Sequence, residues 1–263
     1  MSSPPTLLAF DTSTEQLAIA LLHGGEMWVH NSPGGAAASA ALLPRVQLLL
    51  AQAGLTLQRL DAVAFGIGPG AFTGLRTSCA VAQGLGFGLG CPLLAIDSLL
   101  IVAEDARAQM AEQSARQQYD VFDVVVAVDA RIEQAYVGHY ACMPDSNGPS
   151  WQTLRPPSLL DLQALREMTD QALHTPKQGR RAGSAWQAFG ERAGSQPGAR
   201  QFDSELNRAA ALGRLAGWAW QHGPKLDPAD ALPSYLRDKV ALTTQERLDI
   251  KAAASRWTSQ GCR

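Results

Sequence analysis

The sequence predicts an α/β protein with two lobes, because one arrangement of strands occurs twice. In the first copy, the apolar run Leu7–Phe10 ends at Asp11, and a second apolar run, Leu17–Leu22, follows after a polar turn. The same order of strand, aspartate, turn and strand recurs between Val124 and Tyr140, with Asp129 in the place of Asp11. Between the copies, short apolar strands alternate with segments of helical periodicity, which favours a duplicated α/β unit.

The first half of the chain is expected to alternate strands with helices. A turn at Gly24 and Gly25 favours a hairpin between the second strand and a third, Met27–His30. Segment Ser39–Ala53 repeats apolar residues at spacings of three and four, which indicates a helix, and Gly54 suits its end. By the same reasoning we expect strands at Ala62–Gly66 and Pro92–Ile96, a helix at Thr73–Gly90, and a helix from Ser98, as its cap, to about Gln118.

The second half contains more loop signals. Segments Pro144–Pro157 and Pro176–Gly198 are rich in glycine, proline and polar residues and are expected to be loops, the second interrupted by the apolar piece Ala185–Phe189. Segment Leu206–Gln221 has apolar residues at helical spacing and is expected to be a helix. After Pro233 the chain becomes polar and has no clear apolar period.

Composition and charge exclude several classes of function. The chain has 263 residues, of which 46% are hydrophobic and 17% charged, and this suits a globular protein with a buried core. A net charge of −2 gives no electrostatic case for direct binding to nucleic acid. No apolar run approaches the roughly 20 residues of a membrane span, and the first residues lack the pattern of a signal peptide. We therefore expect a cytoplasmic protein with reduced cysteines.

The segment Gly66–Ser78, which reads GIGPGAFTGLRTS, carries the most local information. It joins a strand to a helix, and its glycines allow another backbone or a phosphate to come close. Thr73 is placed to cap the helix, whose N-terminus attracts anions. The segment is either an anion-cradling or partner-docking turn or an ordinary α/β turn, and it matches neither the P-loop nor the dinucleotide-binding pattern. The candidate anion loop comprises Asp11, Thr12, Ser13, Gly68, Gly70, Thr73 and Arg76.

The helix after this turn contains four glycines: Gly74, Gly84, Gly86 and Gly88. An interior glycine costs about 1 kcal/mol relative to alanine, so four cost roughly 4 kcal/mol. Either the helix ends near Gly84, or its small residues let another helix approach closely. On the second interpretation, Gly74→Ala is expected to leave the monomer as stable as before or slightly more stable.

Four segments make the chain similar to a known family. They are LLAFDTST, GPGAFTGLR, AVDARIEQAYVG and PSYLR, in this order along the chain. They resemble the TsaB (YeaZ) family from about Thr6 to Val240. The resemblance implies the two-lobe actin/Hsp70/sugar-kinase (ASKHA) fold, in which each lobe is a mixed sheet with flanking helices. On this basis residues 1–103 with 206–240 form the first lobe, 104–205 the second, and 241–263 a polar tail that is expected to be partly disordered.

The resemblance also implies a non-catalytic scaffold. Family members are the dimerisation subunit of the bacterial complex that transfers a threonylcarbamoyl group to N6 of the adenosine beside the tRNA anticodon. They support the catalytic subunit TsaD, the ATPase TsaE joins the pair, and tRNA is reached only through the complex. No catalytic residue, metal or cofactor is implied for the chain itself, and a nucleotide is implied only at the interface with the partners.

The residues of the first turn agree with such a role. The turn is Asp11-Thr12-Ser13-Thr14, without the glycine that phosphate-binding relatives place after the aspartate. The five histidines form no H-x-x-x-H pair and lack the spacing of a zinc site. One departure from the family is visible: Ala38 stands where many members have a histidine, which removes one expected partner contact.

Two helices are the expected contact with TsaD, and with a second copy of the chain when TsaD is absent. The apolar stripe of Ser39–Ala53 is wide enough for a core and a partner, and the next helix has a face of small residues. A twofold dimer would use the same patch on both copies. The expected interface residues are Leu42, Val46, Leu49, Phe72, Gly74, Thr77, Ser78 and Val81.

Four further residues are assigned to structural or interlobe positions. Asp129 and Arg131 either pair across the cleft between the lobes or belong to an ordinary exposed turn. Tyr235 and Arg237 are expected to fix the C-terminal segment to the first lobe.

Two other functions stay open as alternatives. One is an ATP-dependent enzyme of the sugar-kinase or ATPase type, against which the missing phosphate-loop glycine argues. The other is a glycoprotease-like peptidase, against which the absence of a metal pair and of a nucleophile turn argues.

Overall fold

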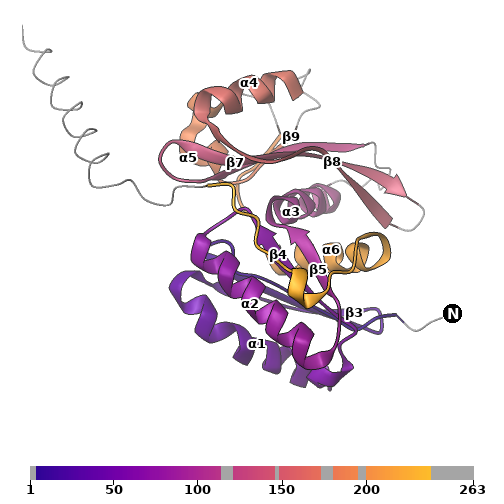
Figure 1. Cartoon of the computed structure of the whole chain (residues 1–263). Coiled ribbons are helices and arrows are strands. Elements are labelled where there is room, and N and C mark those ends of the chain that lie inside the picture. The colour runs from indigo at the N-terminus through magenta and orange to yellow at the C-terminus, as the bar shows by residue number, and fades with distance from the viewer. Residues whose placement is uncertain (1–3, 114–120, 146–147, 173–179, 195–199, 238–263) are drawn as a thin grey trace, which may run out of the picture.

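The computed structural model describes residues 4–113, 121–145, 148–172, 180–194 and 200–237. Two five-stranded sheets with helices on their faces confirm the predicted two-lobe α/β class (Figure 1). The first sheet consists of β1 (Leu7–Asp11), β2 (Gln16–His23), β3 (Glu26–Pro33), β4 (Ala62–Gly68) and β5 (Leu93–Asp97). The second consists of β6 (Phe122–Asp129), β7 (Gln134–Asp145), β8 (Gly148–Asp161), β9 (Arg180–Ala182) and β10 (Arg200–Phe202). The helices are α1 (Ala38–Gln52), α2 (Phe72–Leu89), α3 (Ser98–Gln113), α4 (Leu162–Ala172), α5 (Ala185–Phe189) and α6 (Arg208–His222).

The two sheets share one topology, which confirms the predicted duplication. Their strand orders are β3-β2-β1-β4-β5 and, taken from the corresponding edge, β8-β7-β6-β9-β10. In each sheet the first strand of the unit lies at the centre, antiparallel to the second strand and parallel to the fourth. Asp11 and Asp129 therefore end equivalent central strands.

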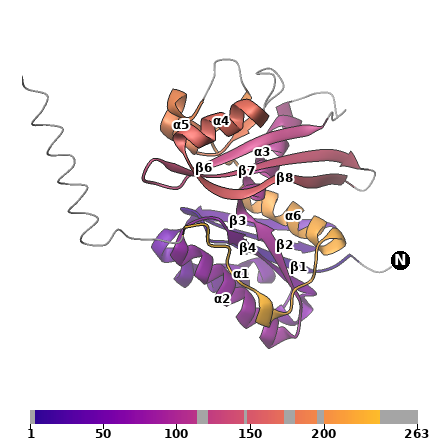
Figure 2. The same ribbon diagram turned by 45° about the horizontal axis from the view of Figure 1, so that its top comes forward.

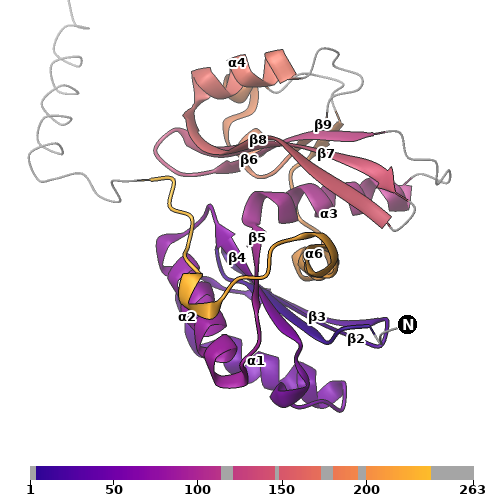
Figure 3. The same cartoon turned by 45° about the vertical axis from the view of Figure 1, so that its right-hand side comes forward.

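Helices α3 and α6 form a layer between the lobes. α3 follows the first sheet in the chain and packs on β6, β7 and β9 of the second, whereas α6 follows the second sheet and packs on β1, β2 and β3. Figures 1 and 3 show both helices between the sheets, with α1 and α2 outside the first sheet and α4 and α5 outside the second. The buried cluster that includes Val102, Val126 and Leu212 fills this layer, so one core joins the two lobes.

Residues 226–237, here called the C-terminal strap, run back along the first lobe and reach the second. Leu226 exchanges backbone hydrogen bonds with Leu93 beside the first sheet. Further along, the Ser234 amide donates to the carbonyl of Ile67 at 2.7 Å. Figure 2 shows the strap leaving α6, passing α2 and approaching the second lobe. The predicted polar tail, 241–263, lies outside the described residues.

The main departure from the predicted elements concerns the second lobe. The predicted loop Pro144–Pro157 belongs instead to a hairpin, because β7 runs to Asp145 and β8 begins at Gly148. β8 is an edge strand, where a proline is tolerated since its missing N–H need not pair with a neighbour. The predicted loop Pro176–Gly198 likewise contains the short strand β9 as well as α5.

Helix α2 also differs from its prediction at both ends. It begins at Phe72 with Ala71 as its N-cap, so Thr73 lies inside the first turn and does not cap the helix. It continues to Leu89 and therefore does not end near Gly84.

Candidate functional site at the junction of the lobes

Polar groups of the first lobe gather where β1 and β4 end and where α2 and α3 begin. In open α/β sheets this is the edge at which ligands bind. Asp11 is fully buried here. Its Oδ1 accepts the Ser13 amide at 2.5 Å, and its Oδ2 accepts the Ser98 hydroxyl at 2.9 Å. Ser98 therefore does not cap α3 as expected, and Asp97 Oδ1 accepts the Leu99 amide at 2.8 Å instead.

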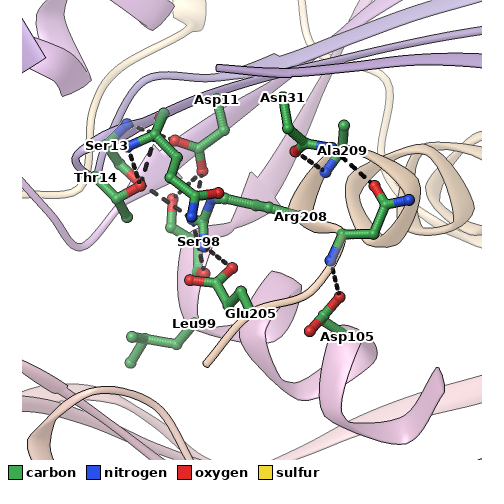
Figure 4. Close-up of polar contacts among 12 residues, drawn as sticks. Asp11, Ser13, Thr14, Asn31, Ser98, Leu99, Asp105, Glu205, Arg208 and Ala209 are labelled. Carbon is green, nitrogen blue, oxygen red and sulfur yellow. Dashed lines mark hydrogen bonds and ion pairs between the residues drawn. The ribbon is translucent and has the colours of Figure 1, made fainter. Parts of the chain in front are cut away.

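Arg208, the first residue of α6, fills the centre of this edge (Figure 4). Its Nη2 donates to Asp11 Oδ2 at 3.0 Å, and its Nη1 donates to Glu205. Longer contacts of 3.4 Å join Nη2 to the Ser13 hydroxyl and to the carbonyl of Ser98. The side chains of Asp11 and Arg208 are both 0% exposed, so solvent and salt do not screen the pair.

The buried charges stabilise one another. Burial by itself raises the pKa of Asp11, but Arg208 and the hydrogen bonds from Ser13 and Ser98 outweigh it and hold this pKa below its ordinary value. Burial lowers the pKa of Arg208, but Glu205 and Asp11 outweigh that effect and raise it. Asp11 and Arg208 are therefore both ionised at neutral pH. For Glu205 burial dominates, and its pKa is raised.

The glycines of GIGPGAFTG pack against the turn that follows β1. A Cβ atom added at any of three of them would lie closer to that turn than the 3.0 Å below which real Cβ contacts are essentially never found. The added Cβ atom would lie 2.3 Å from Asp11 Oδ2 at Gly66, 2.4 Å from the Ser13 carbonyl oxygen at Gly70, and 1.8 Å from the Thr12 carbonyl oxygen at Gly74. The loop thus holds the chain's own backbone, which corrects the anion-cradle interpretation.

Hydrogen bonds fasten the same turn to α2. The Thr12 hydroxyl donates to the carbonyl of Gly74 at 2.7 Å, and the Thr12 amide donates to the Ser78 hydroxyl at 3.1 Å. Gly68, whose φ is +111°, donates its amide to the Ser98 hydroxyl at 3.1 Å. Gly74 and Ser78 are therefore buried inside the monomer, and this corrects their assignment to a partner interface.

The remaining loop residues lie at the surface, next to the C-terminal strap. The Arg76 guanidinium lies 3.8 Å over the ring centroid of Phe72, and its Nε donates to the Tyr235 hydroxyl at 3.1 Å. The Phe72 and Tyr235 rings are 5.1 Å apart. Thr73 is exposed, and its carbonyl accepts the Thr77 hydroxyl at 3.0 Å.

The apolar stripe of α1 faces the core. Leu42, Val46 and Leu49 are at most 4% exposed and pack in the cluster beneath the first sheet, so they are not available to a partner, contrary to expectation. Thr77 is half-buried, and the half-buried Val81 packs against the same cluster.

Other apolar groups cover the outside of the two helices, which lie side by side (Figure 1). Leu43, Leu48 and Phe87 are 44%, 52% and 62% exposed. A Cβ atom at Gly84 or Gly88 would meet no described atom within 4 Å. We call Leu43, Leu48, Gly84, Phe87 and Gly88 the α1/α2 face. Unlike the buried stripe, the residues of this face are all exposed.

Asp129 and Arg131 occupy the turn between β6 and β7. Asp129 Oδ1 accepts the Arg131 amide at 2.7 Å, and the two side chains approach to 3.6 Å, so they pair within the turn rather than across the cleft. Arg237 Nη2 donates to the carbonyl of Ala130 at 2.8 Å and to Gln134 Oε1 at 2.9 Å. Tyr235 thus contacts the first lobe as expected, whereas Arg237 contacts the second.

Arg208 was not identified from the sequence, although its guanidinium pairs with both Asp11 and Glu205 at the centre of the site. A signal was present, because Arg208, Leu212, Leu215 and Ala219 share the apolar face of the predicted helix, and all four are buried. A charge on such a face needs a buried counter-charge, and Asp11 was the candidate.

The described residues form neither a cluster of metal ligands nor a membrane-spanning helix. Among them, no group of three or more histidine, cysteine, aspartate or glutamate side chains is placed to hold a metal ion. No helix within the described ranges is long and apolar enough to span a bilayer. The carboxylates that do meet at the junction, Asp11 and Glu205, share Arg208 between them.

Comparisons with known proteins agree on one family. A tRNA threonylcarbamoyladenosine biosynthesis protein TsaB from Escherichia coli (strain K12) is 30% identical over 237 residues, covering 89% of this chain and 96% of the relative. The TsaB protein from Haemophilus influenzae is 40% identical over 131 residues, covering 50% of this chain and 52% of the relative. The family model TsaD, described as tRNA N6-adenosine threonylcarbamoyltransferase, matches residues 29–147.

Solved structures give the same result. YeaZ from Pseudomonas aeruginosa superimposes with a TM-score of 0.70 at 33% identity. The match covers 88% of this chain and 100% of the YeaZ chain. A second structure from that organism, described as having similarity to peptidase YeaZ, gives a TM-score of 0.74 at 35% identity, covering 89% and 100%. The two-lobe α/β arrangement seen here is thus shared by two solved structures, each of which is matched along its whole length.

Proposed function

The chain belongs to the TsaB (YeaZ) family, and we propose that it is a non-catalytic subunit of the complex that transfers a threonylcarbamoyl group to N6 of the adenosine beside the tRNA anticodon. Family membership ties the chain to the biosynthesis of tRNA threonylcarbamoyladenosine. The part that we propose is the scaffold role: the chain supports a catalytic TsaD subunit and supplies no reacting group itself.

The buried pair of Asp11 and Arg208 carries this proposal. The resemblance implies that phosphate-binding relatives place a glycine after the aspartate that ends the first strand, and in this chain Thr12-Ser13-Thr14 follows Asp11 instead. Here the carboxylate faces a guanidinium from α6, and both side chains are fully buried. A phosphate or metal ion that bound Asp11 would have to compete with Arg208, and displacing Arg208 would leave Asp11 buried without its counter-charge.

The α1/α2 face is the proposed contact with TsaD. It presents three exposed apolar side chains beside two open glycine positions, so a partner helix could approach the backbone of α2 closely. The TsaD family model matches a range that includes both helices, which supports pairing between two related folds. In the absence of TsaD the same face would form a twofold homodimer.

The other partners follow from the same proposal. TsaE would join the pair of subunits, a nucleotide would bind only at an interface between them, and tRNA would be reached only through the complex. A role in tRNA modification would place the chain in the cytoplasm.

Binding to purified TsaD from the same organism tests the proposal. Leu48→Glu and Phe87→Glu each place a charge on the α1/α2 face and are expected to weaken TsaD binding at least tenfold. Leu154→Glu is the matched control, because Leu154 is 42% exposed on β8 of the other lobe. If the two face variants bind as well as wild type while remaining folded, the proposed docking surface is wrong.

A further inference from the structure

Arg181 is a buried arginine in the second lobe, remote from the junction. It lies on β9 between Val125 of β6 and Gln201 of β10. Its guanidinium lies 5.7 Å from the ring centroid of Trp186 on α5, so its side chain is on the side of the sheet that carries α4 and α5. The residue is only 2% exposed.

This guanidinium lacks the partners that a buried charge requires. Its Nε and Nη1 are buried and find no hydrogen-bond acceptor among the described residues. Asp170 on α4 attracts it electrostatically but forms no ion pair with it in the described structure, and burial lowers the pKa of Arg181. Burying a cation without hydrogen bonds lowers the stability of the folded state. Such a residue is therefore expected only where another interaction offsets this loss of stability.

The contrast with Arg208 shows how this chain compensates a buried arginine elsewhere. Arg208 is equally buried, yet two carboxylates, Asp11 and Glu205, accept its N–H groups. At Arg181 the chain places one carboxylate, Asp170, which is exposed and not bonded to it. Among the described residues, no carboxylate bonds to Arg181 as Asp11 and Glu205 bond to Arg208.

Two further arginines, Arg180 and Arg200, lie on the opposite face of the sheet, because successive side chains of a strand point to opposite faces. β9 and β10 both begin with arginine, and Arg180 stands directly opposite Arg200 in the parallel pair. They therefore add no charge on the face that carries Arg181. β10 is the edge strand, so the sheet edge nearest to Arg181 lies just beyond β10.

We propose that Arg181 is the binding residue of an oxyanion site in the second lobe, which takes a phosphate or carboxylate group from the side of the β10 edge. A guanidinium offers such a group two parallel N–H bonds in its own plane. The Trp186 ring lies on one side of this guanidinium, and Nε and Nη1 have no hydrogen-bond partner among the described residues. The site does not depend on the proposed function, and its failure would leave the scaffold role untouched.

Thermal melting of the full chain with increasing inorganic phosphate, and separately with acetate, tests the site. Wild type is expected to show a saturable rise in Tm of roughly 2–4 °C with the preferred anion. Arg181→Met is expected to lose this rise, and to melt at the wild-type temperature or above in anion-free buffer, because it removes the unpaired charge. Arg59→Met, at an exposed arginine of the first lobe, is the control and should retain the rise.

Calorimetric titration of the wild-type chain with the same two anions gives a result that does not depend on the folding of any variant. Saturable binding of phosphate or of acetate supports the site, and the anion that binds identifies its chemistry. No saturable binding of either anion would overturn the proposal. So would a rise in Tm that persists unchanged in folded Arg181→Met, because that outcome marks an adventitious effect of salt.

Discussion

Asp11 and Arg208 come from opposite ends of the chain, 197 positions apart, and meet as a fully buried ion pair with 3.0 Å between Oδ2 and Nη2. Asp11 ends the central strand of the first lobe, and Arg208 begins the helix that returns from the second. Their contact lies at the edge of the sheet where β1 ends and α3 begins. The same pair therefore fastens α6 to the central strand of the first sheet.

Breaking this pair on one side should be strongly destabilising. Asp11→Asn or Arg208→Met leaves the other charge buried and unpaired, so we expect a loss of about 3–5 kcal/mol in the free energy of unfolding. The double variant should lose less than the sum of the two single variants, because neither charge is then left alone. Urea denaturation of the four proteins measures this, and strictly additive losses would show that the two residues do not depend on each other.

Two glycines of α2 should respond in opposite ways to the same substitution. The sequence alone led us to expect that Gly74→Ala would be neutral or slightly stabilising, and the structure overturns this expectation. The new Cβ atom would lie 1.8 Å from the Thr12 carbonyl oxygen, so we expect a loss of about 1–3 kcal/mol in stability. In Gly84→Ala the new Cβ atom has no neighbour within 4 Å, so we expect the free energy of unfolding to rise by about 0.5–1 kcal/mol through the higher helix propensity of alanine. Thermal melts of the two variants compare them directly. A Gly74→Ala protein as stable as wild type would mean that the turn after β1 does not press on α2.

Asp97 should make stability depend on pH. Burial raises its pKa from 3.8 to about 6, although hydrogen bonds, including one of 2.6 Å from the Tyr140 hydroxyl, act against the rise. The folded state then holds this proton more tightly than the unfolded state does. Stability from the protonated group is therefore fully present below pH 3.8 and is lost as pH rises through 6, by about 3 kcal/mol in all.

Asp97→Asn removes the titration while keeping an oxygen for the Leu99 amide. The stability of this variant relative to wild type should increase by roughly 1–2 kcal/mol between pH 5 and pH 7.5. Urea denaturation at several pH values measures the difference, in which the other titrating groups cancel. A difference that stays constant over this range would place the pKa of Asp97 near its ordinary value.

The turn between β6 and β7 should loosen when its anchor on the strap is removed. Arg131, Ile132 and Glu133 all have positive φ, which is strained for residues other than glycine. Arg237 holds the turn through the Ala130 carbonyl. In Arg237→Gln we expect faster hydrogen exchange of the amides in this turn, with exchange in β1 unchanged. Equal exchange rates in the two proteins would show that the strap does not stabilise the turn.

Local patterns were sufficient to predict most of the first lobe. Its strands and helices have apolar periods and clear turn signals, so β1 to β5, α1 and α2 lie close to their predicted ranges. Helix α3 begins at Ser98 as predicted, and its predicted end at about Gln118 lies outside the described residues. The duplication could also be inferred, because the strand-aspartate-turn order repeats. In the second lobe, Pro149, Pro156 and Pro157 suggested a loop, and only the position of β8 at the sheet edge makes them compatible with a strand.

The candidate site depended on contacts between distant residues. Gly74 suggested close packing, but sequence alone could not reveal that the packed group was Thr12, 62 positions earlier in the chain. Likewise, the stripe of α1 correctly indicated an apolar face, yet Leu42 and Val46 are used by the core and Leu43 and Leu48 remain exposed. A helical period shows that a face exists, whereas the tertiary fold decides what covers it.

Reconstitution of tRNA threonylcarbamoyladenosine formation tests the scaffold role most directly. The measurement is the modified nucleoside released from tRNA after incubation with ATP and threonylcarbamoyl precursors, with the chain, TsaD and TsaE each present or left out. We expect product only when the chain and TsaD are both present, and a large loss with a chain that carries Leu48→Glu and Phe87→Glu. Product formed by the chain without TsaD, or an undiminished yield with that folded double variant, would contradict the account.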